Sequence, residues 1–166
     1  LWQPPPAGAA KSACPEEPGA VLALSRMVAA PKDKRNLRHI SKPLKRIMVG
    51  MIDRGRWPVL ITYSDESQGH TGHVYKCSGW QKTLRIANRG ITNATGRRVS
   101  RYSNGKHVKI TGARCVTYVT QRWEQWACPR GQVKPFMESK GWKRVQDGNK
   151  TWKSGNPAYK FVKDVT

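Results

Sequence analysis

The spacing of hydrophobic residues in the first third of the chain predicts one helix. Hydrophobic side chains recur at helical intervals at Leu37, Ile40, Leu44, Ile47, Met48 and Met51. Pro43 lies within this pattern, and a proline is tolerated in the first turn of a helix but not in its interior. We therefore predict a helix that begins near Pro43 and ends near Asp53, preceded by an extended segment or a separate turn.

From Trp57 onward, hydrophobic and polar residues alternate, a pattern that is typical of β-strands with one buried face. Strands are predicted in WPVLITYS (residues 57–64), HVYKCSGW (73–80) and KTLRIANRG (82–90), and in ARCVTYVTQRWEQW (113–126) as far as Gln121. The tryptophan-rich end of the last segment also fits a helix. Beyond Pro135, the breakers Gly-Asn, Ser-Gly and Asn-Pro predict short strands or a final hairpin.

The dipeptide Asn104-Gly105 predicts a two-residue hairpin turn, because both central positions of a type I′ turn require positive φ. Such a turn fixes the register of the flanking strands. The predicted pairs are Ser103–Lys106, Tyr102–His107, Arg101–Val108, Ser100–Lys109 and Val99–Ile110. The hydrophobic side chains then fall on one face, Val99, Val108 and Ile110, and the polar and charged ones on the other, Arg98, Tyr102, His107 and Lys109.

The first 31 residues are rich in proline, alanine and glycine and show almost no periodic hydrophobic pattern. We expect a tail over residues 1–31 that is disordered on its own or extended along a partner surface, and a single basic β-rich domain over residues 32–166. The predicted fold class is β-rich α+β, with a small antiparallel sheet or partly open barrel, one short helix and the extended Pro/Ala-rich tail. The sequence has no run of eighteen apolar residues, so we predict no membrane span.

The charge of the chain is strongly unbalanced. Its 166 residues include 31 lysines and arginines but only 10 aspartates and glutamates, which gives a net charge of +21. Solubility alone needs a net charge of only about 2 to 8 in a small domain. Because like charges repel in a compact state, this excess favours a polyanionic partner, of which nucleic acid is the commonest. The stretch between Ser67 and Trp123 contains no carboxylate at all.

Aromatic residues interleave with the cations, a combination that suits RNA loops and single strands. Lysine and arginine neutralise phosphates, and exposed rings stack on unpaired bases. We predict that the following side chains contact nucleic acid: Lys34, Arg35, Arg38, Lys42, Lys45, Arg46, Lys82, Arg97, Arg98, Arg101, Tyr102, Lys106, His107, Lys109 and Arg122. The leading hypothesis is a non-catalytic RNA-binding structural protein of a large ribonucleoprotein such as a ribosome. Its partners would be structured RNA and neighbouring proteins of the assembly. Its location would be intracellular, and the assembly could be mitochondrial or plastid.

The sequence predicts neither catalysis nor a cofactor. The carboxylates are scattered, and no nucleophile–base set or phosphate loop is present. His70, His73 and Cys77 supply three zinc-competent side chains within eight residues. Histidines flanked by glycine in a loop also fit turn chemistry or a phosphate contact, so we expect no metal site and keep these three as the candidate ligands. The segment IANRGITNATGRRV is similar to DNA-contacting β modules of homing endonucleases, without the His and Asn set of those enzymes.

A second hypothesis is a secreted or virion-surface recognition domain. Asn93-Ala94-Thr95 and Asn149-Lys150-Thr151 are N-glycosylation sequons, and the four cysteines could form two disulfides or remain thiols. The segments HVYKCSGW, WACPRGQ and FMESKGWKRVQDGNKTWKSG resemble the strand-and-cysteine layout of gammaretroviral envelope surface subunits, although most cysteines of that family are missing. The resemblance implies a disulfide-closed, glycosylated domain that binds a cell-surface receptor, and the cations would then bind sulfated glycans.

Overall fold

The computed structural model describes residues 1–27, 40–96, 98–99, 102–103, 106–107, 109–151, 155 and 157–164, with the backbone alone at residues 98, 102, 103, 106 and 107. Its α-helices in this part of the chain are α1 (Ala7–Ala13), α2 (Ser41–Asp53), α3 (His73–Cys77) and α4 (Val133–Ser139). The strands are β1 (Trp2–Gln3), β2 (Val21–Leu24), β3 (Val59–Asp65), β4 (Gln81–Thr92), β5 (Arg98–Val99), β6 (Tyr102–Ser103), β7 (Lys106–His107), β8 (Arg114–Trp126), β9 (Trp142–Thr151) and β10 (Pro157–Lys163).

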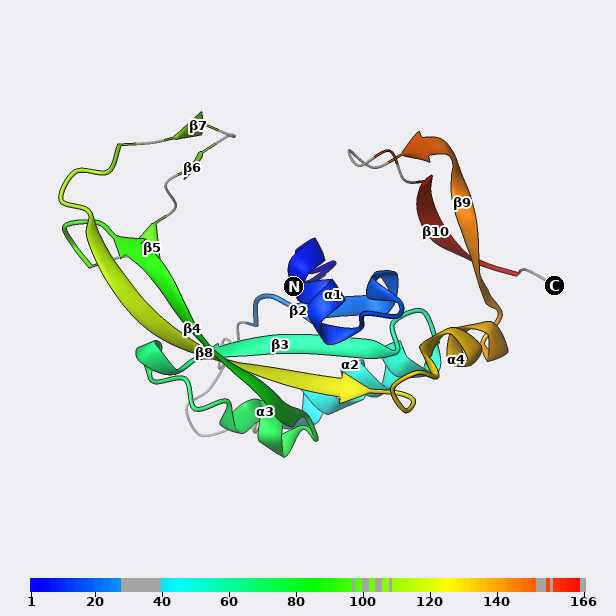
Figure 1. Cartoon of the computed structure of the whole chain (residues 1–166). Helices are drawn as coiled ribbons and strands as arrows, with labels where there is room; N and C mark the ends of the chain where they lie inside the picture. Colours follow the sequence, from blue (N-terminus) through cyan, green and yellow to red (C-terminus); the bar gives the residue numbers. More distant parts are fainter. Residues whose placement is uncertain are drawn as a thin grey trace.

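The described strands form one six-stranded sheet and two separate hairpins (Figure 1). The strand order of the sheet is β1-β2-β3-β8-β4-β5, and the hairpins are β9–β10 and β6–β7. β2 runs parallel to β3, whereas the other pairs are antiparallel. The sheet is therefore mixed rather than purely antiparallel, and its described strands do not close into a barrel.

Helices cover both faces of the central strands, because β2 and β3 are hydrophobic on both sides. Val21 and Ala23 of β2 and Ile61 of β3 pack with α1 and α4 in one buried cluster. Leu22 and Leu60 point to the opposite face, where they pack with residues of α2 and with two buried tryptophans. This alternation follows from the strand period of two, and it divides the core into two layers.

The predicted helix is confirmed. α2 spans Ser41–Asp53, with Pro43 in its first turn, and it buries Leu44 and Met48. A proline here costs little, because the first N–H groups of a helix have no partner within it. The strands predicted at residues 57–64 and 82–90 are also confirmed as β3 and β4, and the final hairpin as β9–β10.

Two other expectations for the middle of the chain are wrong. Residues 73–77 form the short helix α3, in which Tyr75 and Lys76 donate backbone hydrogen bonds to Gly72. β8 stays extended through Trp126, because it is a central strand that pairs with β3 on one side and β4 on the other. In an extended strand Trp123 and Trp126 point to opposite faces, so each joins a different core cluster.

The prediction of an extended N-terminal tail is also wrong. The segment before Ser25 contributes β1, α1 and β2, and all four residues of β2 are buried. The sequence pattern concealed these elements because they are short, and because a strand that is buried on both faces has no polar alternation. Alanine at positions 10 and 13 lets α1 approach the sheet closely. The end of the predicted tail, residues 28–31, lies outside the described residues, as do residues 32–39.

The two pairs of the predicted hairpin that lie nearest its turn are confirmed. Tyr102 pairs with His107 and Ser103 with Lys106. The turn residues Asn104 and Gly105 and the pairs that involve Ser100, Arg101 and Val108 lie outside the described residues. The outermost predicted pair is wrong, since Val99 pairs with Ile91 of β4, and Ile110 is in no strand.

Candidate functional site

The outer face of α2 gathers three of the predicted nucleic-acid contacts. Lys42, Lys45 and Arg46 are exposed and, with Val49, line a hollow of about 430 Å³. Arg54, which follows the last residue of α2, lines a neighbouring hollow with Arg46. We call Lys42, Lys45, Arg46 and Arg54 the α2 patch. The helix period places these side chains outward because Leu44 and Met48 point into the core.

No carboxylate of the described residues forms an ion pair with the α2 patch. Lys42 and Arg46 are four residues apart on a helix, so their like charges repel by about 0.2 to 0.5 kcal/mol. Hydrophobic side chains border the patch, since Ile47 is 52% and Val49 45% exposed. An anion bound in the hollow would relieve the repulsion.

A second basic surface follows β4 and β8 where they extend beyond the central sheet as a two-stranded ribbon (Figure 1). Arg89 and Arg114 are exposed on it, as is Lys109 beside it. The exposed Lys82 lies instead within the central sheet, opposite Trp123 of β8. Arg85 forms an ion pair with Glu66 at 2.9 Å. Most β4 residues of the ribbon are at least partly exposed on both faces. Two strands without a covered face are only marginally stable alone, so the ribbon is suited to a partner that covers it.

The β9–β10 hairpin differs from these two surfaces because its cations are largely paired. Lys150 and Lys160 both lie 2.9 Å from Asp147, whose pKa is lowered by the hydrogen bonds from Lys160 and Lys150. Lys143 pairs with Asp164, and this hydrogen bond raises the pKa of the lysine. Arg144 pairs with Glu17 at 3.3 Å. These charges are already neutralised within the protein and are less available to an external anion.

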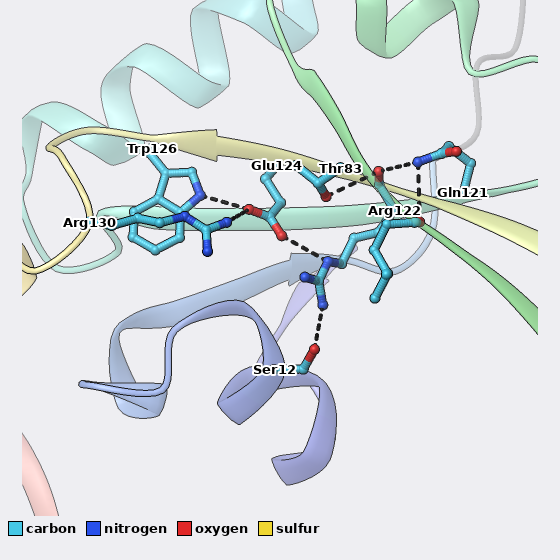
Figure 2. Close-up of polar contacts among 8 residues, drawn as sticks. Ser12, Thr83, Gln121, Arg122, Glu124, Trp126 and Arg130 are labelled. Carbon is cyan, nitrogen blue, oxygen red and sulfur yellow. Dashed lines mark hydrogen bonds and ion pairs between the residues drawn. The ribbon is translucent and has the colours of Figure 1, made fainter.

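Arg122 does not face solvent, contrary to the prediction that it contacts nucleic acid. Its guanidinium forms an ion pair with Glu124 at 2.8 Å and donates to the Ser12 hydroxyl at 2.9 Å (Figure 2). Glu124 also accepts hydrogen bonds from Trp126 at 2.8 Å and Arg130 at 3.0 Å. Arg122 therefore holds α1 against β8. The sequence held a signal for this ion pair, because the spacing Arg-x-Glu in a strand places both side chains on one face.

The three candidate metal ligands do not assemble into a site. His73 and Cys77 are one helical turn apart in α3, with the ring nitrogen Nε2 and Sγ at 3.4 Å. His70 lies in the preceding loop. In the described part of the chain, no group of three or more His, Cys, Asp or Glu side chains has metal-binding geometry. All four cysteines are free thiols, which leaves the disulfides of the secreted-domain hypothesis unformed.

The remaining predicted contacts are spread over the molecule. Lys34, Arg35, Arg38, Arg97 and Arg101 lie outside the described residues. Arg98, Tyr102, Lys106 and His107 are placed by their backbone alone, in β5, β6 and β7. The predicted set does not include Arg54, Arg89 and Arg114, which are exposed and form no ion pair with a carboxylate of the described residues.

None of the tryptophans that the structure describes is exposed. Trp80 and Trp123 are buried, and the other described tryptophans, Trp2, Trp57, Trp126 and Trp142, are half-buried. Arg56 lies over the ring of Trp57 at 3.8 Å, and burial lowers the pKa of this arginine. The expected stacking of bases on exposed tryptophans thus has no counterpart among these residues.

None of the helices in the described ranges is both long and apolar enough to cross a membrane. No protein family matches the sequence, and no curated protein is similar enough to serve as a relative.

Proposed function

We propose that the protein is a non-catalytic RNA-binding structural component of a ribonucleoprotein, and that the α2 patch and the β4–β8 ribbon contact phosphates. The observation that carries the proposal is the convergence of Lys42, Lys45 and Arg46 on one hollow without a carboxylate partner among the described residues. The net charge of +21 is consistent with an RNA that contacts the chain on several sides.

Both surfaces suit the backbone of structured RNA more than individual bases. Their exposed groups are cations on long flexible stems, which neutralise phosphates without reading sequence. The ribbon is extended and exposed on both faces, so it can follow a groove or insert between RNA elements. Neighbouring proteins of the same assembly could cover the exposed Ile47 and Val49.

The alternative of a secreted or virion-surface domain has less support. It depends on disulfides, whereas the structure has all four cysteines as free thiols. Intact mass under reducing and non-reducing conditions separates the two proposals. Glycans at Asn93 or Asn149, or two disulfides, would favour the secreted domain.

The test of the RNA-binding proposal is the salt dependence of affinity for an RNA stem-loop with an internal loop. Each neutralised phosphate contributes about 0.7 to 0.9 to the slope of log K against log salt concentration. We expect K42A/K45A/R46A to reduce the slope by about 2 to 3 units. A slope near zero for the unchanged chain would overturn the proposal.

A matched control is K134A/K150A/K160A, which removes the same number of charges. These lysines pair with Glu138 and Asp147, so their removal should change the slope far less. Equal losses in both variants would mean that total charge, and not the α2 patch, determines binding.

A further inference from the structure

A hollow of about 610 Å³ lies beside the segment Gly69–Tyr75, which leads from a loop into α3, and beside the residues that follow β2. Its described walls come from this segment, from Tyr63 and Ser64 of β3, and from residues 25–27 after β2. Ser25 is held there by a hydrogen bond from its backbone N–H to the Leu1 carbonyl at 3.0 Å. The volume is in the range of about 300 to 1,000 Å³ that small-molecule sites occupy.

The side chains around this hollow combine cationic groups with an aromatic ring. Arg26, His70 and His73 supply nitrogen atoms, and Tyr75 supplies a ring and a hydroxyl. The ring of Tyr63 packs on the opposite face of the sheet, in the cluster that contains Ile61. No carboxylate is among the described residues that line the hollow, and no described carboxylate pairs with the Arg26 guanidinium. Guanidinium groups bind phosphate oxygens in bidentate fashion, and aromatic faces stack on nucleobases.

The inner wall of the hollow is closely packed against buried residues. The Tyr75 ring lies 6.0 Å from the rings of both Trp80 and Trp123, which are buried. Trp123 in turn donates a hydrogen bond from Nε1 to the Ser64 hydroxyl at 2.9 Å. Gly72 packs so tightly on Trp123 that an added Cβ would lie 2.3 Å from Cζ2. A wall held in place in this way lowers the entropy cost of binding.

We propose that this hollow binds a single unpaired nucleotide of the bound RNA, with its phosphate toward Arg26 and His70 and its base against Tyr75. The inference rests on the proposed RNA-binding function and names a site that the phosphate-contacting surfaces do not provide. A base pair within a helix cannot enter a hollow of this size, so the nucleotide must be bulged or flipped out of its stack. The α2 patch has no ring in its hollow and therefore does not compete for a base.

The experiment measures affinity of the full chain for two RNA stems that differ by one bulged uridine. Stacking of one base predicts that the bulged RNA binds about 5- to 150-fold more tightly than the fully paired RNA. R26A/H70A should reduce this preference to less than 2-fold and leave binding to the paired stem within about 3-fold. K134A/K150A is the matched control, and it should keep the preference of the unchanged chain.

A second variant tests the hollow without changing charge. T71W places an indole in the hollow from an exposed lining residue, and it should abolish the bulge preference while the thermal unfolding transition is retained. If both R26A/H70A and T71W keep the preference for the bulged RNA, the proposal that the hollow binds the bulged nucleotide is overturned.

The remaining outcomes separate the pocket from the proposed function. Binding of both stems with a normal salt slope but no bulge preference overturns the pocket and leaves RNA binding intact, whereas no binding of either stem overturns both. Uridine monophosphate is the third probe. The hollow could instead prefer a free nucleotide. In that case uridine monophosphate binds the free protein, R26A/H70A weakens this binding, and the bulge has no effect on RNA affinity. This result would overturn the proposal that the ligand is a nucleotide of the bound RNA.

Discussion

The Arg122 guanidinium lies 2.8 Å from the Glu124 carboxylate, and the two residues are 5% and 1% exposed. This pair connects the central strand to α1 through Ser12. Removing one partner of a buried ion pair leaves an uncompensated charge in the interior, which typically lowers the free energy of unfolding by about 3 to 5 kcal/mol. The first residues of the chain therefore depend on a charge pair more than 100 positions away in sequence.

Glu124→Gln should lower the free energy of unfolding by about 3 to 5 kcal/mol, because Arg122 stays buried without its counter-charge. Denaturant unfolding followed by tryptophan fluorescence measures the change. Glu138→Gln is the control, since that carboxylate is exposed and lies 3.9 Å from Lys134. Similar losses in both variants would contradict the role assigned to the buried pair.

Leu22→Ala should destabilise the protein by about 2 to 5 kcal/mol, the usual cost of truncating a buried leucine. Leu22 is buried in β2, within the segment that its composition assigned to a tail. Leu1→Ala, at a position that is 69% exposed, should change stability by less than about 0.5 kcal/mol. If chemical denaturation curves of L22A and the unchanged chain coincide, residues 21–24 are not part of the folded core.

Gly72→Ala should be more destabilising than Gly79→Ala. Both glycines have positive φ, 71° and 88°, where an alanine costs roughly 1 to 2 kcal/mol. Only at Gly72 would the new Cβ also collide with Trp123, because the space at Gly79 is open. Thermal melts of the two variants give the comparison, and equal melting temperatures would mean that the Gly72–Trp123 contact is absent in solution.

Burial raises the pKa of the Cys14 thiol from 9.0 to about 11. The folded protein thus retains this proton at a pH where the unfolded chain has released it. The resulting stabilisation is fully present below pH 9, and it is lost by roughly 1.4 kcal/mol per pH unit between about pH 9 and 11. The stability difference between the unchanged chain and C14A should change with this slope, and parallel curves would contradict it.

Reaction with a maleimide offers a second check on the same thiol. Cys77 and Cys115 are exposed, so they should react at pH 8, whereas the wholly buried Cys14 should remain unmodified until the protein unfolds. Mass spectrometry after proteolysis identifies the labelled positions. Fast labelling of Cys14 would show that α1 opens readily from the sheet.

The sequence sufficed to predict elements whose periodicity extends over several turns or several alternating positions. α2 was predictable because Leu44 and Met48 repeat at helical spacing, and β4 because its strand pattern is long. β3 was predictable because a run of hydrophobic and β-branched residues follows Pro58. α3 was not, because five residues fit a strand and a single helical turn equally well, and packing of Tyr75 on two tryptophans decides between them.

The candidate site was predictable only in part, for a similar reason. Charge counts located Lys42, Lys45 and Arg46, but they could not distinguish these free cations from Arg122, whose partner Glu124 is two residues away. Availability of a cation depends on burial and on counter-charges that tertiary structure brings together. The hollow beside Gly69–Tyr75 draws on three separate segments, so no local pattern indicated it.

The position of β8 between β3 and β4 affects when the protein can fold during synthesis. Five strands of the sheet precede β8 in the chain, yet β3 and β4 have no direct pairing with one another. Until Trp126 has left the exit tunnel, the hydrophobic β3 lacks its neighbour on that side, and the nascent chain must be protected from premature association. Under the proposed function, docking of the cationic segments on RNA during synthesis would supply such protection.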